Sequence, residues 1–148
     1  MKKILISLVV LSSMLLGCSK TASSDNLSWE TNLETALKKA KAENKAVLVN
    51  FTGSDWCKWC IKLSDEVFSK SEFEDFAKEN LILVKLDFPN SIKQTEETKK
   101  YNNQLAQKYG IEGFPSILIL NSSGTLVLRT GYQPGGPVEY VKHIQEKI

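Results

Sequence analysis

The chain has 148 residues, 42% of them hydrophobic, and a formal net charge of +2 with its single histidine neutral. This length suits one domain with a sizeable core. The near-neutral charge argues against nucleic acid as a partner, because proteins that bind nucleic acid normally present a basic face.

Residues 1–17 are predicted to be a signal peptide. Lys2 and Lys3 give it a positive start, and an apolar run from Ile4 to Leu16 is interrupted only by serine. The run is short for a membrane span, which takes about 20 apolar residues, and it suits the apolar region of a secretory signal. Removing this segment leaves a formal charge of zero, so electrostatic docking on a membrane is not expected.

The stretch Leu15-Leu16-Gly17-Cys18 resembles the bacterial lipobox. The resemblance implies a mature protein that begins at Cys18, with the cysteine sulfur carrying diacylglycerol and anchoring the chain in the bacterial cell envelope, facing the periplasm. Ser19 resembles the pattern that is sorted to the outer membrane where there are two membranes. Residues 18–28 would then be the lipidated cysteine followed by a flexible tether, because residues 19–28 are mostly small and polar. An ordinary signal peptide next to a free cysteine is the alternative.

The folded domain is expected over residues 29–148. Thr31 and Glu34 have the spacing of a capping box, which predicts a helix running to about Asn44. The apolar run from Val47 to Thr52 predicts a buried strand. Gly53-Ser54-Asp55 is then expected to turn the chain.

The stretch Trp56-Cys57-Lys58-Trp59-Cys60 follows this turn. Cysteines three positions apart at the start of a helix lie on one helical face, within reach of each other. The helix N-terminus and Lys58 both bring positive charge, so they are expected to stabilise a thiolate at Cys57. The pattern predicts a redox dithiol in which Cys57 attacks a disulfide and Cys60 resolves the product.

Two other interpretations of the cysteine pair remain open. The pair could supply two of the four ligands of a zinc site. Beyond the pair, the only other cysteine and histidine in the chain are Cys18 and His143. A purely structural disulfide would close a very short loop and constrain the unfolded chain little. We expect no metal and no other cofactor.

The later elements follow from the same kinds of pattern. A second capping box at Ser71 and Glu74 predicts a short helix. The further expected elements are a strand over 81–87, a loop over 88–95, a helix from Glu96 ended by Gly110, a strand over 116–120, a hairpin turn over 121–124, a strand over 125–130, and a helix from Pro137 with Val138, Val141, Ile144 and Ile148 on its inner face. Because strands separated by helices usually pair in parallel, we expect an α/β fold with a central mixed sheet and helices on both faces.

The cysteine motif after a strand, with Gly113-Phe114-Pro115-Ser116 before a hairpin, resembles the thioredoxin family over residues 29–148. The stretch from Phe51 to Cys57 most resembles thioredoxin-like periplasmic reductases of the Dsb type, the C-terminal domain of DsbD among them. The resemblance implies a thioredoxin-like fold and a cis Pro115 beside the dithiol. It also implies that Phe114 and Pro115 form the edge on which the backbone of a substrate lies.

One departure from the thioredoxin pattern stands out. The buried aspartate that helps deprotonate the resolving cysteine in that family is replaced here by Asn50. An amide cannot take a proton, so water, Asp55 or Glu66 would substitute, or resolution by Cys60 would be slower.

Several aromatic and basic side chains have two interpretations. Trp56 precedes the first cysteine and Trp59 lies between the two cysteines. Trp59 is expected to face solvent, where it would either contact a partner protein or shield the disulfide. Lys58 either tunes Cys57 or is simply solvated. Trp29 is expected to pack on the edge of the sheet. His143 is expected to be exposed and without a catalytic role.

The function expected from the residues and the resemblance is an extracytoplasmic disulfide reductase that acts on protein disulfides. The motif has no internal histidine and the domain no separate dimerisation region, which favours a reductant over an oxidase or isomerase. A membrane electron donor of the DsbD kind would re-reduce the pair. A disulfide oxidase or isomerase, and a non-catalytic binding or assembly module with the thioredoxin fold, are the alternatives.

Overall fold

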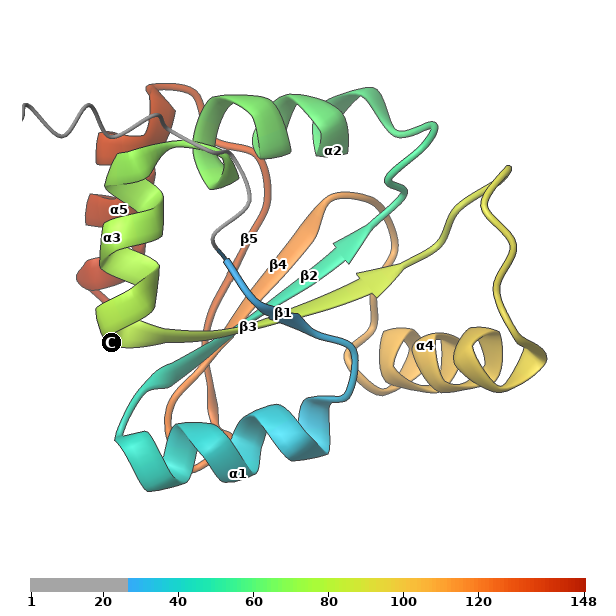
Figure 1. The fold of residues 1–148 in the computed structure, drawn as a ribbon, viewed down its shortest axis with the longest axis horizontal. Helices are drawn as coiled ribbons and strands as arrows, with labels where there is room; N and C mark the ends of the chain where they lie inside the picture. Colours follow the sequence, from blue (N-terminus) through green and yellow to red (C-terminus); the bar gives the residue numbers. More distant parts are fainter. Residues whose placement is uncertain (1–26) are drawn as a thin grey trace, which may run out of the picture.

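The computed structural model describes residues 27–148, so the predictions for residues 1–17, for lipidation of Cys18 and for the tether up to residue 26 lie outside the described residues. The elements, in chain order, are β1 (Trp29–Glu30), α1 (Leu33–Glu43), β2 (Ala46–Thr52), α2 (Lys58–Leu63), the π-helical turn η1 (Ser64–Phe68), α3 (Ser71–Asn80), β3 (Leu81–Asp87), α4 (Glu96–Lys108), β4 (Ser116–Leu120), β5 (Leu126–Thr130) and α5 (Gly136–Gln145) (Figure 1).

The strands form one five-stranded sheet in the order β1-β3-β2-β4-β5. β2 pairs in parallel with β3, and β4 pairs antiparallel with both β2 and β5, so the predicted mixed sheet is confirmed. The prediction that strands separated by a helix pair in parallel was wrong for β4, which pairs antiparallel with β2. The connection through α4 returns the chain to the carboxyl end of β2, where Ser116 pairs with Phe51, instead of crossing back to the other end of the sheet. β1, an edge strand parallel to β3, was not predicted.

Helices cover both faces of the sheet, as expected. α1 and α4 pack on one face around Val47, Val49 and Phe51, while α2, η1, α3 and α5 pack on the other around Leu48, Ile117 and Ile119 (Figure 1). The alternation of these side chains along the strands gives each face its own apolar core. Trp29 lies on the edge strand β1 and packs 5.4 Å from Phe68 between ring centroids, which confirms its predicted place.

Both predicted capping boxes were wrong in detail. Asn32, not Thr31, caps α1, and its side chain accepts from the N–H of Thr35 at 2.7 Å. Glu34 instead accepts a hydrogen bond from the Tyr101 hydroxyl, and this bond holds the pKa of Glu34 below its usual range.

α3 begins without a side-chain cap, because Lys70 stands at the capping position and Ser71 is already helical. The end of α4 follows the prediction. Gly110 has a φ of +60°, and the N–H groups of Gly110 and Ile111 turn back to the carbonyls of Gln107 and Ala106.

The inner face of α5 differs from the expected one. Tyr140 and Ile144 are fully buried, whereas Val138 and Ile148 are 59% and 46% exposed. α5 therefore packs through an aromatic residue that the apolar repeat had left out. In the span from residue 27 to the C-terminus, no helix has the length and apolar character needed to cross a membrane.

Candidate active site: a dithiol at the start of α2

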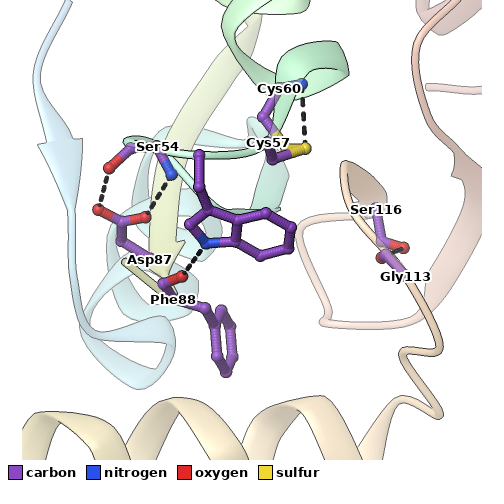
Figure 2. The surroundings of a disulfide bond; sticks show 8 residues. Ser54, Cys57, Cys60, Asp87, Phe88, Gly113 and Ser116 are labelled. Carbon is purple, nitrogen blue, oxygen red and sulfur yellow. Dashed lines mark hydrogen bonds between the residues drawn. A yellow bond between two sulfur atoms is a disulfide. The ribbon is translucent and has the colours of Figure 1, made fainter. Parts of the chain in front are cut away.

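Cys57 and Cys60 form a disulfide at the start of α2 (Figure 2), with their Cα atoms 5.2 Å apart. Cys57 is the N-cap of this helix, and its sulfur accepts the backbone N–H of Cys60 at 3.2 Å. Both residues are almost buried, with 6% and 5% of their surface exposed. The predicted placement of the pair is confirmed. A donor N–H aimed at the Cys57 sulfur would favour its thiolate form.

The turn that carries the cysteines is fixed to the end of β3. The Asp87 carboxylate accepts hydrogen bonds from the Ser54 backbone N–H at 3.0 Å and from the Ser54 hydroxyl at 2.5 Å (Figure 2). The N–H of Cys57 also donates to the carbonyl of Gly53 at 2.9 Å. The two bonds from Ser54 join the turn after β2 to the last residue of the neighbouring parallel strand β3, so the cysteines start from a defined position.

Trp56 lies across the same turn. Its indole Nε1 donates to the Phe88 carbonyl at 2.8 Å, and its ring meets the edge of Phe114 with 6.0 Å between centroids. Gly53 makes room for it, because a Cβ on Gly53 would lie 2.5 Å from the indole Cε2. With 46% of its surface exposed, Trp56 forms a partly open apolar wall beside the dithiol.

The Phe114–Pro115 peptide bond is cis, as the resemblance implied. The Ser116 hydroxyl donates to the Gly113 carbonyl at 2.7 Å and closes this bend (Figure 2). Phe114 also packs on Phe88, with 5.0 Å between ring centroids. The structure thus brings Trp56 and the predicted substrate edge into one aromatic cluster next to the cysteines.

Trp59 belongs to a second cluster on the other side of the motif. It is 49% exposed, as expected, and its ring lies 5.1 Å from that of Tyr132. The Lys62 ammonium sits over both rings, 5.3 Å and 5.2 Å from their centroids. The Tyr132 hydroxyl donates to Glu66 at 2.7 Å. Trp59 therefore packs within the protein against Tyr132 and Lys62, while about half of its surface remains exposed.

The two carboxylates considered as substitutes for the missing buried aspartate have other partners. Asp55 accepts the backbone N–H groups of Asn90, Ser91 and Ile92, and these bonds, led by that of Asn90, lower its pKa. Glu66 is engaged by Tyr132 and by Lys62. Each carboxylate is thus held in a network of its own.

Asn50, on β2, is nearly buried on the face of the sheet that α2 covers. It is 7% exposed, and its Oδ1 is buried without a hydrogen-bond partner. Asn50 and Cys60 both line a cavity of about 350 Å³ between the sheet and the α2–η1 segment, together with Thr52, Ser64 and Lys85. The position that carries the departure from the thioredoxin pattern therefore lines the same cavity as the resolving cysteine.

The remaining predicted residues have less connection with the dithiol. Lys58 is exposed in the first turn of α2, next in sequence to Cys57. His143 is half-buried instead of exposed, because its Nε2 lies 3.0 Å from the Thr130 hydroxyl and its ring packs near Tyr140. From residue 27 onward, no three histidine, cysteine or acidic side chains gather as a metal site would require.

Sequence reasoning missed the groups that support the site, namely Gly53, Asp87, Phe88 and Tyr132. Asp87 ends a predicted strand and Phe88 begins a predicted loop, and both positions lie where the carboxyl ends of neighbouring strands meet. Their place at the carboxyl ends of the strands could have predicted that Asp87 and Phe88 lie near the cysteine motif. Gly53 was predicted only as part of a turn, and its close approach to the Trp56 ring was not foreseen. The contacts of Tyr132 with Trp59 and Glu66 join distant parts of the chain and left no pattern in the sequence.

Comparison with known proteins agrees with this geometry. Residues 33–144 match the family described as "Thioredoxin-like domain". The chain is 39% identical over 123 residues to the disulfide bond reductase DsbH of Chlamydia pneumoniae, covering 83% of this chain and 74% of that protein.

Two solved structures add to this comparison. A structure titled DsbH oxidoreductase superposes with a TM-score of 0.79 at 37% identity, over 92% of this chain and 94% of the other. The oxidised C-terminal domain of DsbD from Neisseria meningitidis matches with a TM-score of 0.56 at 17% identity, over 82% of this chain and all of that domain. This second likeness concerns the fold alone.

Proposed function

The chain belongs to the thioredoxin-like family and is a thiol-disulfide oxidoreductase with a Cys57–Cys60 pair, and from this premise we propose that it works outside the cytoplasm as a reductase of protein disulfides. The observation that carries the proposal is the position of the pair. The attacking sulfur caps a helix and receives an N–H, beside a cis-proline bend with an aromatic wall.

Each sulfur has its own role in the proposed reaction. The Cys57 thiolate attacks one sulfur of a substrate disulfide, forms a mixed disulfide with it and releases the other substrate sulfur as a thiolate. Cys60 then attacks the Cys57 sulfur, which closes the Cys57–Cys60 bond and frees the reduced substrate. Two electrons pass from the protein to the substrate. Phe114 and Pro115 hold the extended substrate backbone beside Cys57, and Lys58 favours the Cys57 thiolate by its charge.

The direction of electron flow is supported by the motif and by the relatives. The residues between the cysteines are Lys58 and Trp59. Strong oxidants have an unusually stable reduced form, often because of a histidine between the cysteines, and this chain has no histidine there. The relative from Chlamydia pneumoniae carries the name disulfide bond reductase. Both observations favour reduction over oxidation or isomerisation.

Every turnover leaves the pair oxidised, so a reductase needs a source of electrons. We propose a membrane donor of the DsbD kind, which would pass electrons by the same disulfide exchange. The proposal includes lipid attachment at Cys18 after removal of residues 1–17, which would keep the domain near the membrane through a short tether. The protein would then face the periplasm, on the outer membrane where the cell has two.

The test of this function is reduction of insulin disulfides by dithiothreitol in the presence of catalytic amounts of the protein. We expect acceleration by the wild-type chain and none by Cys57→Ser. A Cys60→Ala variant should accumulate mixed disulfides with its substrates, since the resolving thiol is missing. A wild-type chain that leaves insulin intact but reactivates scrambled ribonuclease would contradict the proposal and favour an isomerase.

Anchoring has a separate test in cells. Wild-type chain should partition with membranes and carry a lipid label, and Cys18→Ala should do neither. Release of the wild-type chain into the soluble fraction would contradict the lipid anchor without affecting the proposed chemistry.

A further inference from the structure

We propose that the side-chain oxygen of Asn50 accepts a hydrogen bond from the Cys60 thiol when the pair is reduced, and that this bond, available in one redox state only, helps to set the reduction potential. The proposal depends on the cycling of the Cys57–Cys60 pair and not on the direction of electron flow. It assigns Asn50 as a positioning residue for the resolving sulfur.

The first observation is a buried side-chain oxygen that has no hydrogen-bond donor. Among the buried side-chain nitrogen and oxygen atoms of residues 27–148, Asn50 Oδ1 alone lacks a partner. A buried carbonyl oxygen without a donor is costly, and native proteins rarely keep one. Asn50 lines the same cavity as Cys60, so a donor on the resolving cysteine would satisfy this oxygen.

The second observation is where Asn50 points. Along β2, Leu48 packs with the helices α2, α3 and α5, whereas Val49 and Phe51 pack on the opposite face. Asn50 is two residues from Leu48, so it shares the face covered by α2. Cys60 lies buried on α2, and both residues line the same cavity, which Cys57 does not reach.

The chemistry of the pair supplies the missing donor. In the disulfide, neither sulfur carries a hydrogen, so nothing on Cys60 can donate to the amide oxygen. Reduction by two molecules of glutathione breaks the Cys57–Cys60 bond. It adds two electrons and two protons to the protein sulfurs and joins the two glutathione sulfurs in a disulfide. The Cys60 thiol then has an S–H, a weak donor that a carbonyl oxygen can accept.

A bond that forms only after reduction stabilises the dithiol relative to the disulfide. Replacing Asn50 by leucine, which has a similar size, would remove this bond from the dithiol form and the orphaned oxygen from the disulfide form. Both effects favour the disulfide. We expect the equilibrium constant for disulfide formation to rise about tenfold, which corresponds to a potential about 30 mV more negative.

The experiment is equilibration of the wild-type chain and Asn50→Leu with glutathione buffers, followed by alkylation of free thiols and quantification by mass spectrometry. Thr52→Val is the matched control, since Thr52 is a second buried polar residue of β2 that lines the same cavity. We expect a shift toward the disulfide in Asn50→Leu and little change in Thr52→Val. An unchanged potential in Asn50→Leu, or an equal shift in both variants, would overturn the proposal.

A second measurement separates this effect from a general loss of stability. Denaturant unfolding of both redox forms should show that Asn50→Leu leaves the disulfide form at least as stable as wild type and weakens the dithiol form. Equal losses in both forms would overturn the proposal. Asn50→Ala repeats the test if the leucine variant does not fold. The comparison uses potentials relative to wild type, so failure of insulin reduction by the wild-type chain would contradict the proposed function alone.

Discussion

The Trp56 indole donates a hydrogen bond to the carbonyl of Phe88, 2.8 Å away, and thereby joins the cysteine motif to the loop that follows β3. Trp56 and Phe88 both pack against Phe114, at centroid distances of 6.0 Å and 5.0 Å. The cysteine motif, the loop after β3 and the cis-proline bend therefore share one aromatic cluster. We expect a substitution in any of the three to change the position of the dithiol.

The glycine beneath this cluster gives the first prediction. A Cβ at Gly53 would collide with the Trp56 indole at 2.5 Å. Because the ring is held by a hydrogen bond and by Phe114, we expect Gly53→Ala to lower stability by about 1–3 kcal/mol, as overpacking typically does, and to slow insulin reduction. Denaturant unfolding and the insulin assay measure the two effects.

A double-mutant cycle makes this prediction specific to the tryptophan. In a Trp56→Ala background the added methyl group should cost little, since its collision partner is gone. Gly113→Ala is the matched control, because a Cβ there meets no atom within 4 Å. A cost of Gly53→Ala that persists without the indole would contradict this account.

Asp55 provides a prediction on pH. Its carboxylate accepts the N–H groups of Asn90, Ser91 and Ile92, and these bonds hold its pKa below the ordinary value of 3.8. A lowered pKa in the folded state means that the carboxylate stabilises the loop above about pH 3.8 and that this contribution is lost as pH falls through the folded pKa. The protection of the amides of residues 90–92, measured as hydrogen exchange relative to the intrinsic rate at each pH, should therefore fall in that acidic range.

The matched variants for this test are Asp55→Asn and Asp75→Asn. The first should show fast exchange in the loop at every pH, since the neutral amide is a weaker acceptor for the three N–H groups. The second removes an exposed carboxylate on α3 and should leave the acid transition unchanged. Loss of the transition in Asp75→Asn would assign it to another group.

Tyr140 gives a prediction on stability. It is fully buried, and its hydroxyl donates to the Gly131 carbonyl at 3.0 Å. Tyr140→Phe keeps the ring and should cost about 1 kcal/mol for the lost bond, whereas Tyr140→Ala also opens a cavity and should cost about 3–5 kcal/mol. Val138→Ala, on an exposed position of the same helix, should change the free energy of unfolding little. Equal losses in the alanine variants at 138 and 140 would contradict the observed face of α5.

The role proposed for Lys58 can be measured directly. Lys58 lies next in sequence to Cys57 and is exposed, so its Coulomb attraction for the thiolate is weak, and Lys58→Gln should raise the pKa of Cys57 slightly. The ultraviolet absorbance of the thiolate against pH, in the reduced protein, reports this value. Lys70→Gln removes an equal charge from the start of α3 and should leave the Cys57 pKa where it was. Identical curves for wild type and Lys58→Gln would show that Lys58 is simply solvated.

Much of this fold follows from local patterns. The strand over 81–87, the start of α2 at the cysteines and the glycine that ends α4 all depend on residues close in sequence, and all were predicted. The antiparallel direction of β4 and the two-residue strand β1 depend on where distant segments meet. The apolar periodicity of the sequence carries no information on which distant strands pair.

The site divides in the same way. The dithiol follows from the spacing of its two cysteines, and the cis Pro115 was implied by the resemblance to the thioredoxin family. The hydrogen bonds between Ser54 and Asp87 join residues 33 positions apart. The lack of a partner for the Asn50 oxygen depends on every side chain packed around it. Propensity and spacing carry no information on either, because both depend on three-dimensional packing.

The reduction potential of the Cys57–Cys60 pair tests the central claim most directly. Equilibration of the full domain with thiol–disulfide buffers of known composition gives this value. A reductase is expected to have a potential closer to that of thioredoxin, about −270 mV, than to that of the strong oxidant DsbA, about −120 mV. A measured value near −120 mV would contradict the proposed direction of electron flow.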